Sequence, residues 1–178
     1  MSKCGVRLVL WLLLCGISIA AGISVDVLLR TPAFPVSVRV LGLAGMVLAF
    51  FPIQRSGKLL RILGDSVRWG CTTRLVTTDI YRCVRHPHHM AVGVFMTSLG
   101  LFIGHCGSLL LIAVTQWLWI VGFLFLVEEK ELERNFGDDY RNYRREAPML
   151  FPRLLCVVRI LTRPIEAPRV ALGRQNEG

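Results

Sequence analysis

Four long apolar stretches, separated by short polar segments, dominate the pattern of this chain. They run over about residues 6–29, 36–53, 90–103 and 109–127. Few charged residues interrupt them, and roughly 20 apolar residues in a helix are enough to cross a bilayer. The pattern therefore predicts an all-α fold, namely a multi-pass transmembrane helical bundle with about four spans.

The first apolar stretch can be interpreted in two ways. Its basic start at Lys3 and Arg7 and the small residues Ser18 and Ala20 fit a signal peptide that is later removed. The run is also long enough to span a membrane by itself. We favour a retained transmembrane helix.

The polar segments differ in charge, and this difference predicts the topology. Residues 55–85 carry seven arginines or lysines against two aspartates, whereas the turn at residues 104–108 carries no formal charge. Because basic loops tend to stay on the cytosolic side, we expect the basic segment and the C-terminus to face the cytosol. The membrane would be that of the endoplasmic reticulum in a eukaryote, or the inner membrane in a bacterium.

After residue 128 the chain becomes polar. Apolar side chains recur at spacings of three or four over residues 132–143, which predicts an amphipathic cytosolic helix, broken near Gly137. We expect residues 1–153 to form a single membrane-embedded domain. Residues 154–178 are expected to form an interfacial segment followed by a loose tail.

The composition agrees with a membrane protein. Hydrophobic residues make up 53% of the 178 residues and charged residues only 19%, and the mean hydropathy is +0.54. The net charge of +9 does not indicate nucleic acid, because the basic residues flank the apolar stretches where membrane topology places them. Six cysteines are scattered without a C-x-x-C pair, so no disulfide framework is indicated.

Two charged clusters bracket the last two apolar stretches. Arg85, His86 and Pro87 precede the third stretch, and Glu128 and Glu129 follow the fourth. About 17 helical residues lead from the first cluster to the turn and about 21 lead back, so both clusters return to one side of the bilayer. A cationic group that faces a carboxylate pair suits a zwitterionic ligand, such as the methionine end of S-adenosylmethionine.

Other interpretations of these residues stay open. Arg85 and the histidines are also typical of interfacial anchors. Cys83, His86 and His89 are spaced by three residues, as metal ligands on a helix can be. Pro87 interrupts the helix that such spacing requires, and no C-x-x-C or H-E-x-x-H motif accompanies it. We therefore assign no metal.

A combination of motifs extends over about residues 73–153. It comprises a tyrosine-containing segment before Arg-His-Pro, an apolar hairpin, a glutamate pair, a Phe-Gly-Asp-Asp-Tyr element and a proline-bounded end. This combination resembles the isoprenylcysteine carboxyl methyltransferase family and its phospholipid methyltransferase relatives. The residues that carry it are Leu75, Val76, Tyr81, Val84, Arg85, His86, Pro87, Glu128, Glu129, Phe136, Gly137, Asp138, Asp139, Tyr140, Tyr143, Pro148 and Pro152.

The resemblance implies a multi-spanning α-helical enzyme that binds S-adenosylmethionine at the cytosolic ends of its last helices. A lipophilic acceptor would enter from the bilayer. Glu129 and Tyr140 match positions that support such a site. The residues that match the cofactor region are Leu75, Tyr81, Arg85, His86 and Glu128, together with His89 in place of a family tyrosine.

The chain also departs from the family pattern. Asp79 replaces a glycine, and Leu124 stands where the isoprenylcysteine enzymes carry an arginine associated with the substrate. These departures argue against carboxyl methylation of a prenylated cysteine itself. Two outcomes stay open: the cofactor is retained while the acceptor differs, or the activity is lost.

We therefore expect an S-adenosylmethionine-dependent methyltransferase that acts on a lipid or a lipidated, isoprenylcysteine-like acceptor. The sulfonium is a good leaving group, so the protein mainly has to align the nucleophile with the methyl carbon. An amine acceptor would need a base, for which His86, His88 and Glu129 are the candidates. Two alternatives stay open: an NADPH-dependent sterol-type membrane reductase, and a non-catalytic membrane protein that retains the fold.

Overall fold

The fold is helical throughout the residues that the computed structural model describes, which are 3–64, 73–152, 155, 156 and 158. This confirms the predicted all-α class. The helices in chain order are α1 (Lys3–Leu29), α2 (Val36–Leu63), α3 (Ile80–Cys83), α4 (Pro87–Ile103), α5 (Cys106–Phe123), a π-helical turn η1 (Leu124–Glu128) and α6 (Glu129–Glu146).

The helix lengths and compositions agree with a multi-pass membrane protein. Three helical segments are long and apolar enough to cross a membrane: Gly5–Leu29, Val36–Leu63 and Cys106–Glu146. The shorter apolar helix α4 accompanies them. Many large apolar side chains of these helices are exposed, as expected for residues that face lipid tails.

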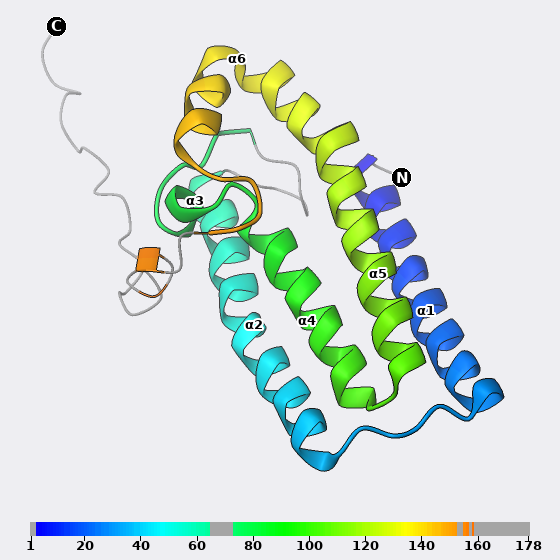
Figure 1. Cartoon of the computed structure of the whole chain (residues 1–178). Helices are drawn as coiled ribbons and strands as arrows, with labels where there is room; N and C mark the ends of the chain where they lie inside the picture. The colour runs from blue at the N-terminus through cyan, green and yellow to red at the C-terminus, as the bar shows by residue number, and fades with distance from the viewer. Residues whose placement is uncertain (1–2, 65–72, 153–154, 157, 159–178) are drawn as a thin grey trace, which may run out of the picture.

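The long helices lie side by side in the order α2, α4, α5, α1 (Figure 1). The connection between α1 and α2 runs past the turn of the α4–α5 hairpin. There the Phe34 amide donates a hydrogen bond of 2.7 Å to the Gly104 carbonyl, and Ala33 forms an isolated bridge with His105. Gly104 ends α4 with a φ of 90°, a left-handed conformation that glycine adopts at low cost.

The observed boundaries follow the predicted spans with two differences. Helix α2 continues past the predicted end at residue 53 to Leu63, and α5 begins at Cys106, so the hairpin turn is shorter than expected. Helix α4 starts at Pro87, whose missing amide proton has no intrahelical partner in a first turn. The break in α6 falls at Gly137, which has a φ of 52°.

A close contact between α2 and α4 depends on a glycine. A Cβ atom added to Gly42 would lie 2.6 Å from the Phe102 amide nitrogen and 2.8 Å from the Ser98 carbonyl oxygen. No side chain fits in that space. Small residues at such contacts let two transmembrane helices approach closely and gain packing energy.

At the hairpin-turn end, a buried aspartate joins α1 to α5. The Asp26 carboxylate accepts hydrogen bonds of 2.8 Å from the amides of Gly107 and Ser108, and one from the Ser108 hydroxyl. Thr31 also donates to it, over 2.6 Å. A carboxylate is stabilised at a helix N-terminus, which explains a charged residue inside an apolar stretch.

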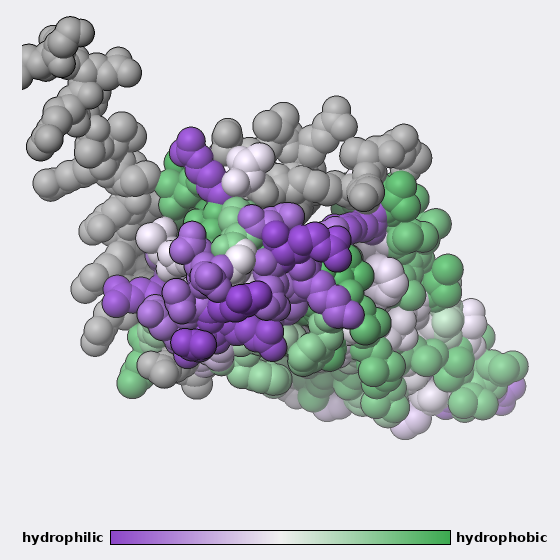
Figure 2. All heavy atoms as spheres, turned by 90° about the horizontal axis from the view of Figure 1, so that it is seen from above, coloured by the Kyte–Doolittle hydropathy of each residue, from purple (hydrophilic) through white to green (hydrophobic). Residues whose placement is uncertain are grey.

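The opposite end of the bundle is polar. Viewed from that end, hydrophilic residues gather in one patch and apolar residues lie next to them (Figure 2). This end also holds α3, the start of α4 and the start of α1 (Figure 1). The two charged clusters of the sequence therefore lie at the same end of the bundle.

Among the described residues, a disulfide joins two cysteines whose pairing the sequence did not indicate. Cys83 of α3 is bonded to Cys156, which is 73 positions away. Cysteine spacing alone could not reveal this pair, because the two thiols meet only after the chain has folded. The bond joins the residues just before the Arg-His-Pro motif to the segment that follows α6.

Candidate functional site

Backbone hydrogen bonds join the segment before α4 to the segment after α6. The Arg85 amide donates to the Pro148 carbonyl over 2.8 Å, and the His86 amide donates to the Met149 carbonyl over 3.2 Å. Two stretches that lie more than sixty positions apart in the sequence thus run next to each other. Their side chains then converge on the glutamate pair at the start of α6.

Glu129 is the most fully bonded side chain of this site. It is buried, with 6% of its surface exposed. Its carboxylate accepts hydrogen bonds from the Tyr140 hydroxyl over 2.6 Å and from Arg85 over 3.3 Å, and its Oε1 lies 2.7 Å from His86 Nε2. Such a buried charge is tolerated because partners surround it.

Arg85 also holds the end of α6. One terminal nitrogen of its guanidinium donates to the carbonyls of Arg144 and Ala147, over 2.8 and 3.1 Å. Cationic side chains commonly stabilise the unpaired carbonyls at a helix C-terminus. The side chain is buried, and its Nε atom has no hydrogen-bond partner.

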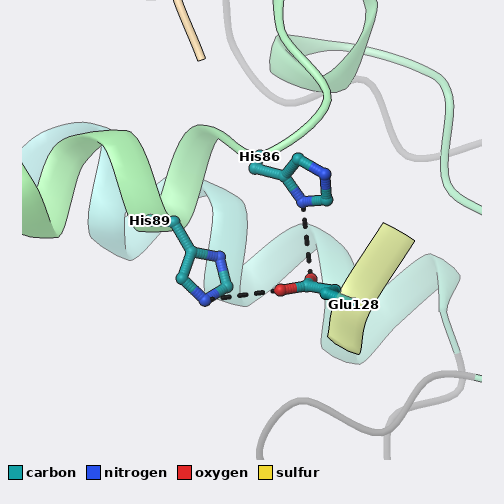
Figure 3. A group of neighbouring side chains, drawn as sticks. All are labelled: His86, His89 and Glu128. Atoms are coloured by element: carbon teal, nitrogen blue, oxygen red, sulfur yellow. Dashed lines mark ion pairs between the residues drawn. The ribbon is translucent and has the colours of Figure 1, made fainter. Parts of the chain in front are cut away.

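Glu128 faces two histidines. Its Oε1 lies 3.5 Å from His86 Nδ1, and its Oε2 lies 3.4 Å from His89 Nε2 (Figure 3). Oε2 is buried and has no hydrogen-bond partner. Burial by itself would lower the pKa of His86, but the carboxylates of Glu128 and Glu129 outweigh it and raise this pKa above its ordinary value.

The π-helical turn η1 precedes this pair of glutamates. A π turn contains an extra residue, so it changes which face of the helix the following side chains present. Leu124, at its start, is fully buried against Ile120 and Leu150. Phe125 and Leu126 are exposed on its outer side. Such turns occur frequently at functional sites.

The other predicted site residues lie around this centre. Leu75 packs against the cluster of Tyr140 and Tyr143. Tyr81 is buried, and burial raises its pKa well above the ordinary value. His88 lies on the side of α4 that faces α2, with its Nδ1 3.4 Å from the Ser56 hydroxyl oxygen.

Asp79 occupies the position where the resembled family has glycine. Its backbone conformation explains why glycine suits this position. Its φ of 57° and ψ of −130° lie outside the regions that residues with a side chain favour. Its carboxylate accepts a hydrogen bond from the Ile80 amide and forms two bonds of 2.7 Å with Arg55 of α2. The negative charge is therefore paired, and it does not face the site unopposed.

Arg7 of α1 reaches the site from the other side of the bundle, which sequence analysis missed. Its guanidinium makes two hydrogen bonds of 2.6 and 2.8 Å with Glu131 and lies 5.5 Å from the centre of the Phe123 ring. In the sequence it is only a basic residue in front of an apolar run. The signal that could have indicated the Arg7–Glu131 pair is an arginine near the start of an apolar span, together with a second helix that begins with acidic residues.

Comparison with known proteins agrees with this geometry. The sequence profile of the family described as phospholipid methyltransferase matches residues 36–139, which include α2, α4, α5 and the glutamate pair. The chain belongs to this family. The matched residues include Arg85, His86, Glu128 and Glu129, and the resemblance stated from the sequence is confirmed.

Named relatives of the chain include methyltransferases with different acceptors. The chain is 38% identical over 80 residues to a protein-S-isoprenylcysteine O-methyltransferase of Schizosaccharomyces pombe, covering 44% of this chain and 33% of that protein. It is 36% identical over 98 residues to methanethiol S-methyltransferase 2 of Bradyrhizobium diazoefficiens, covering 52% and 36%. A methanethiol S-methyltransferase of Pseudomonas deceptionensis is 37% identical over 79 residues, covering 44% and 28%. The chain spans about a third of the length of these curated relatives.

The pairing of Arg55 with Asp79 predicts a measurable coupling. A double-mutant cycle with Arg55→Met and Asp79→Asn should give a coupling energy of about 0.5–3 kcal/mol, because each single change leaves a largely buried charge without its partner. Thermal unfolding of the purified protein in detergent measures it. Additive effects of the two changes would contradict the ion pair.

Proposed function

We propose that this protein is an S-adenosylmethionine-dependent methyltransferase whose acceptor is lipophilic and enters from the bilayer. Membership of the phospholipid methyltransferase family supports the reaction class. The cofactor, the acceptor and the roles of the individual residues are inferred from the site.

The observation that carries the proposal is a pair of buried polar atoms without partners. Among the residues that the structure describes, three buried side-chain nitrogen or oxygen atoms lack a hydrogen bond, and two of them are Arg85 Nε and Glu128 Oε2. Buried polar groups are normally paired. An unpaired donor and an unpaired acceptor in one site fit a ligand that carries both a carboxylate and an ammonium group.

The methionine end of S-adenosylmethionine carries these two groups, and its sulfonium supplies the methyl group. Glu128 would accept from the ammonium, and Arg85 would donate to the carboxylate through Nε. The sequence predicted only that a cationic group faces the glutamate pair, without saying which atoms of Arg85 reach the ligand. Most of the Arg85 guanidinium is bonded to Glu129 and to the end of α6.

The geometry also bears on the choice of base. Both nitrogens of His86 face carboxylates, Glu129 already accepts from several donors, and His88 faces Ser56. Each of these candidates for the base is therefore already engaged by a neighbouring side chain. We therefore favour an acceptor that is already anionic, such as a carboxylate or a thiolate, because it needs no base.

Two features support approach of the acceptor from the membrane. Phe125 and Leu126 are exposed directly beside Glu128, on a helix that is apolar enough to span a bilayer. Leu124 is fully buried in an apolar cluster, so the helical turn that leads to Glu128 is apolar on its inner side as well. An apolar acceptor with a small anionic head suits these surroundings better than a large polar one.

The cofactor assignment predicts different effects for neighbouring glutamates. Glu128→Gln should weaken S-adenosylmethionine binding by about 1.5–3 kcal/mol, because it removes a charge-assisted acceptor. Glu129→Gln should mainly lower the melting temperature, since it leaves buried donors without their carboxylate. Calorimetry with S-adenosylmethionine and NADPH, with melting curves for each variant, measures both effects.

Glu133→Gln is the matched control for these variants. Glu133 lies on the same helix, is partly exposed and pairs with Arg141 at the surface. It should leave both affinity and melting temperature nearly unchanged. If Glu128→Gln bound S-adenosylmethionine as well as the Glu133 control did, the cofactor assignment would be wrong; tight NADPH binding would favour the reductase.

The acceptor class can be tested by transfer of a labelled methyl group. Purified protein with methyl-labelled S-adenosylmethionine should methylate a prenyl thiol or a long-chain carboxylic acid in detergent or vesicles. Transfer to a phospholipid amine should be much slower, because no base is aligned for it. Faster methylation of free methanethiol than of any lipophilic compound would contradict the bilayer route.

We further propose that the site faces the cytosol. The basic segments at this end support that orientation. The Cys83–Cys156 disulfide argues in the other direction, because reducing compartments rarely retain such bonds. Cys106, an exposed free thiol at the hairpin turn, should be labelled by an impermeant reagent only from the non-cytosolic side. Labelling from the cytosol would reverse the topology.

A further inference from the structure

Three side chains at the site direct metal-binding atoms toward one point. We propose that His86, His89 and Glu128 form a binding site for a divalent transition-metal ion, with Zn²⁺ as the best-matched ion. Each residue contributes one ligand atom, and no two of the three atoms lie more than 4.8 Å apart. No other group of histidine, cysteine, aspartate or glutamate ligands within the described residues comes together in this way.

Each imidazole lies beside one oxygen of the same carboxylate. Glu128 Oε1 is 3.5 Å from His86 Nδ1 and Oε2 is 3.4 Å from His89 Nε2, which is long for an N–H···O hydrogen bond of typically about 2.7–3.2 Å. A tetrahedral ion with bonds of about 2.0–2.2 Å separates its ligands by about 3.4 Å, so each imidazole nitrogen lies about that far from one of the two carboxylate oxygens. In Figure 3 both rings point at the same carboxylate, one at each oxygen.

The contact with Glu129 orients His86 as a metal ligand. Its Nε2 lies 2.7 Å from Glu129 Oε1, so Nε2 can donate to Glu129 while Nδ1 faces Glu128, where a bound ion would take the place of a proton. Tyr140 and Arg85 in turn hold Glu129. Carboxylate groups that orient a ligating histidine in this manner are a regular part of metal sites.

The local backbone explains why the sequence pattern argued against a metal. The spacing suggested a helix that includes Cys83, and Pro87 interrupts it. In the structure His86 stands just before α4, with non-helical φ and ψ of −119° and 62°, and reaches Glu128 from outside the helix. Cys83 is bonded to Cys156, and Glu128 from η1 takes its place as the third ligand.

A metal at this point has a consequence for the cofactor, a step that rests on the proposed function. Three protein ligands leave a fourth position for water, as in open zinc sites. The ion would engage the Glu128 oxygen that the ammonium group of S-adenosylmethionine needs. Metal and cofactor should therefore exclude each other, so that Zn²⁺ inhibits the enzyme reversibly.

Titration calorimetry with ZnCl₂ on the full chain in detergent tests the site. The wild type should bind one ion, and His89→Ala should bind it at least tenfold more weakly. His88→Ala is the matched control in the same helical turn, since His88 faces α2. Cys106→Ser tests binding to an exposed thiol. Both controls should bind Zn²⁺ as the wild type does.

Visible absorption of bound Co²⁺ provides a readout of coordination that a folding defect cannot imitate. The wild type and His88→Ala should give the intense bands of a tetrahedral ion, and Glu128→Gln should not. Equal Zn²⁺ affinity in the wild type and His89→Ala, or loss of binding in Cys106→Ser, would overturn the proposal.

Competition separates this site from the proposed function. Saturating Zn²⁺ should raise the Kd for S-adenosylmethionine at least tenfold in the wild type and leave it nearly unchanged in His89→Ala. Unaltered cofactor affinity in zinc-saturated wild type would refute mutual exclusion. If the protein bound Zn²⁺ but not S-adenosylmethionine, the proposed function would be refuted and the proposed metal site would be supported.

Discussion

The buried carboxylate of Glu129 is the interaction on which the organisation of this site depends. It brings together a hydroxyl from within α6, an imidazole at the start of α4 and a guanidinium from the segment before α4. Removing one partner would leave a charge or a donor buried without compensation. The partners also fix the position of His86, and through it the side chains that face Glu128. Glu129 thus positions the groups around Glu128, although its own carboxylate oxygens are already hydrogen-bonded.

A second buried carboxylate, at the other end of the bundle, has a comparable structural effect. Asp26 joins α1 to the N-terminus of α5 through amide and hydroxyl donors. Arg7 and Glu131 join the same two stretches of chain at the site end. Helix α1 is therefore anchored to the α5–α6 segment at both ends, while α2 and α4 approach closely at Gly42. Polar contacts inside an apolar medium specify which helices are neighbours, because lipid offers them no alternative partner.

The departures from the family pattern have different physical meanings. At Asp79 the change is compensated, since Arg55 pairs with the new charge and the aspartate keeps a backbone conformation that glycine would adopt more easily. At Leu124 the side chain is buried in an apolar cluster with Ile120 and Leu150. The first departure therefore introduces a charge that is paired within the fold, whereas the second leaves an apolar side chain at a position next to the glutamate pair.

The sequence alone determined the class of the protein, the positions of the apolar helices and the end of the bundle where the charged clusters lie. Hydropathy and helix length decide these features, because a bilayer admits few arrangements of an apolar chain. The tertiary structure decided which groups pair: Arg85 with Glu129, His86 with both glutamates, Arg55 with Asp79 and Cys83 with Cys156. Such pairing depends on the rotation of each helix about its axis. The π turn before Glu128 and the positive φ at Asp79 change the local direction of the chain without leaving a periodic signal in the sequence, so only the folded chain reveals them.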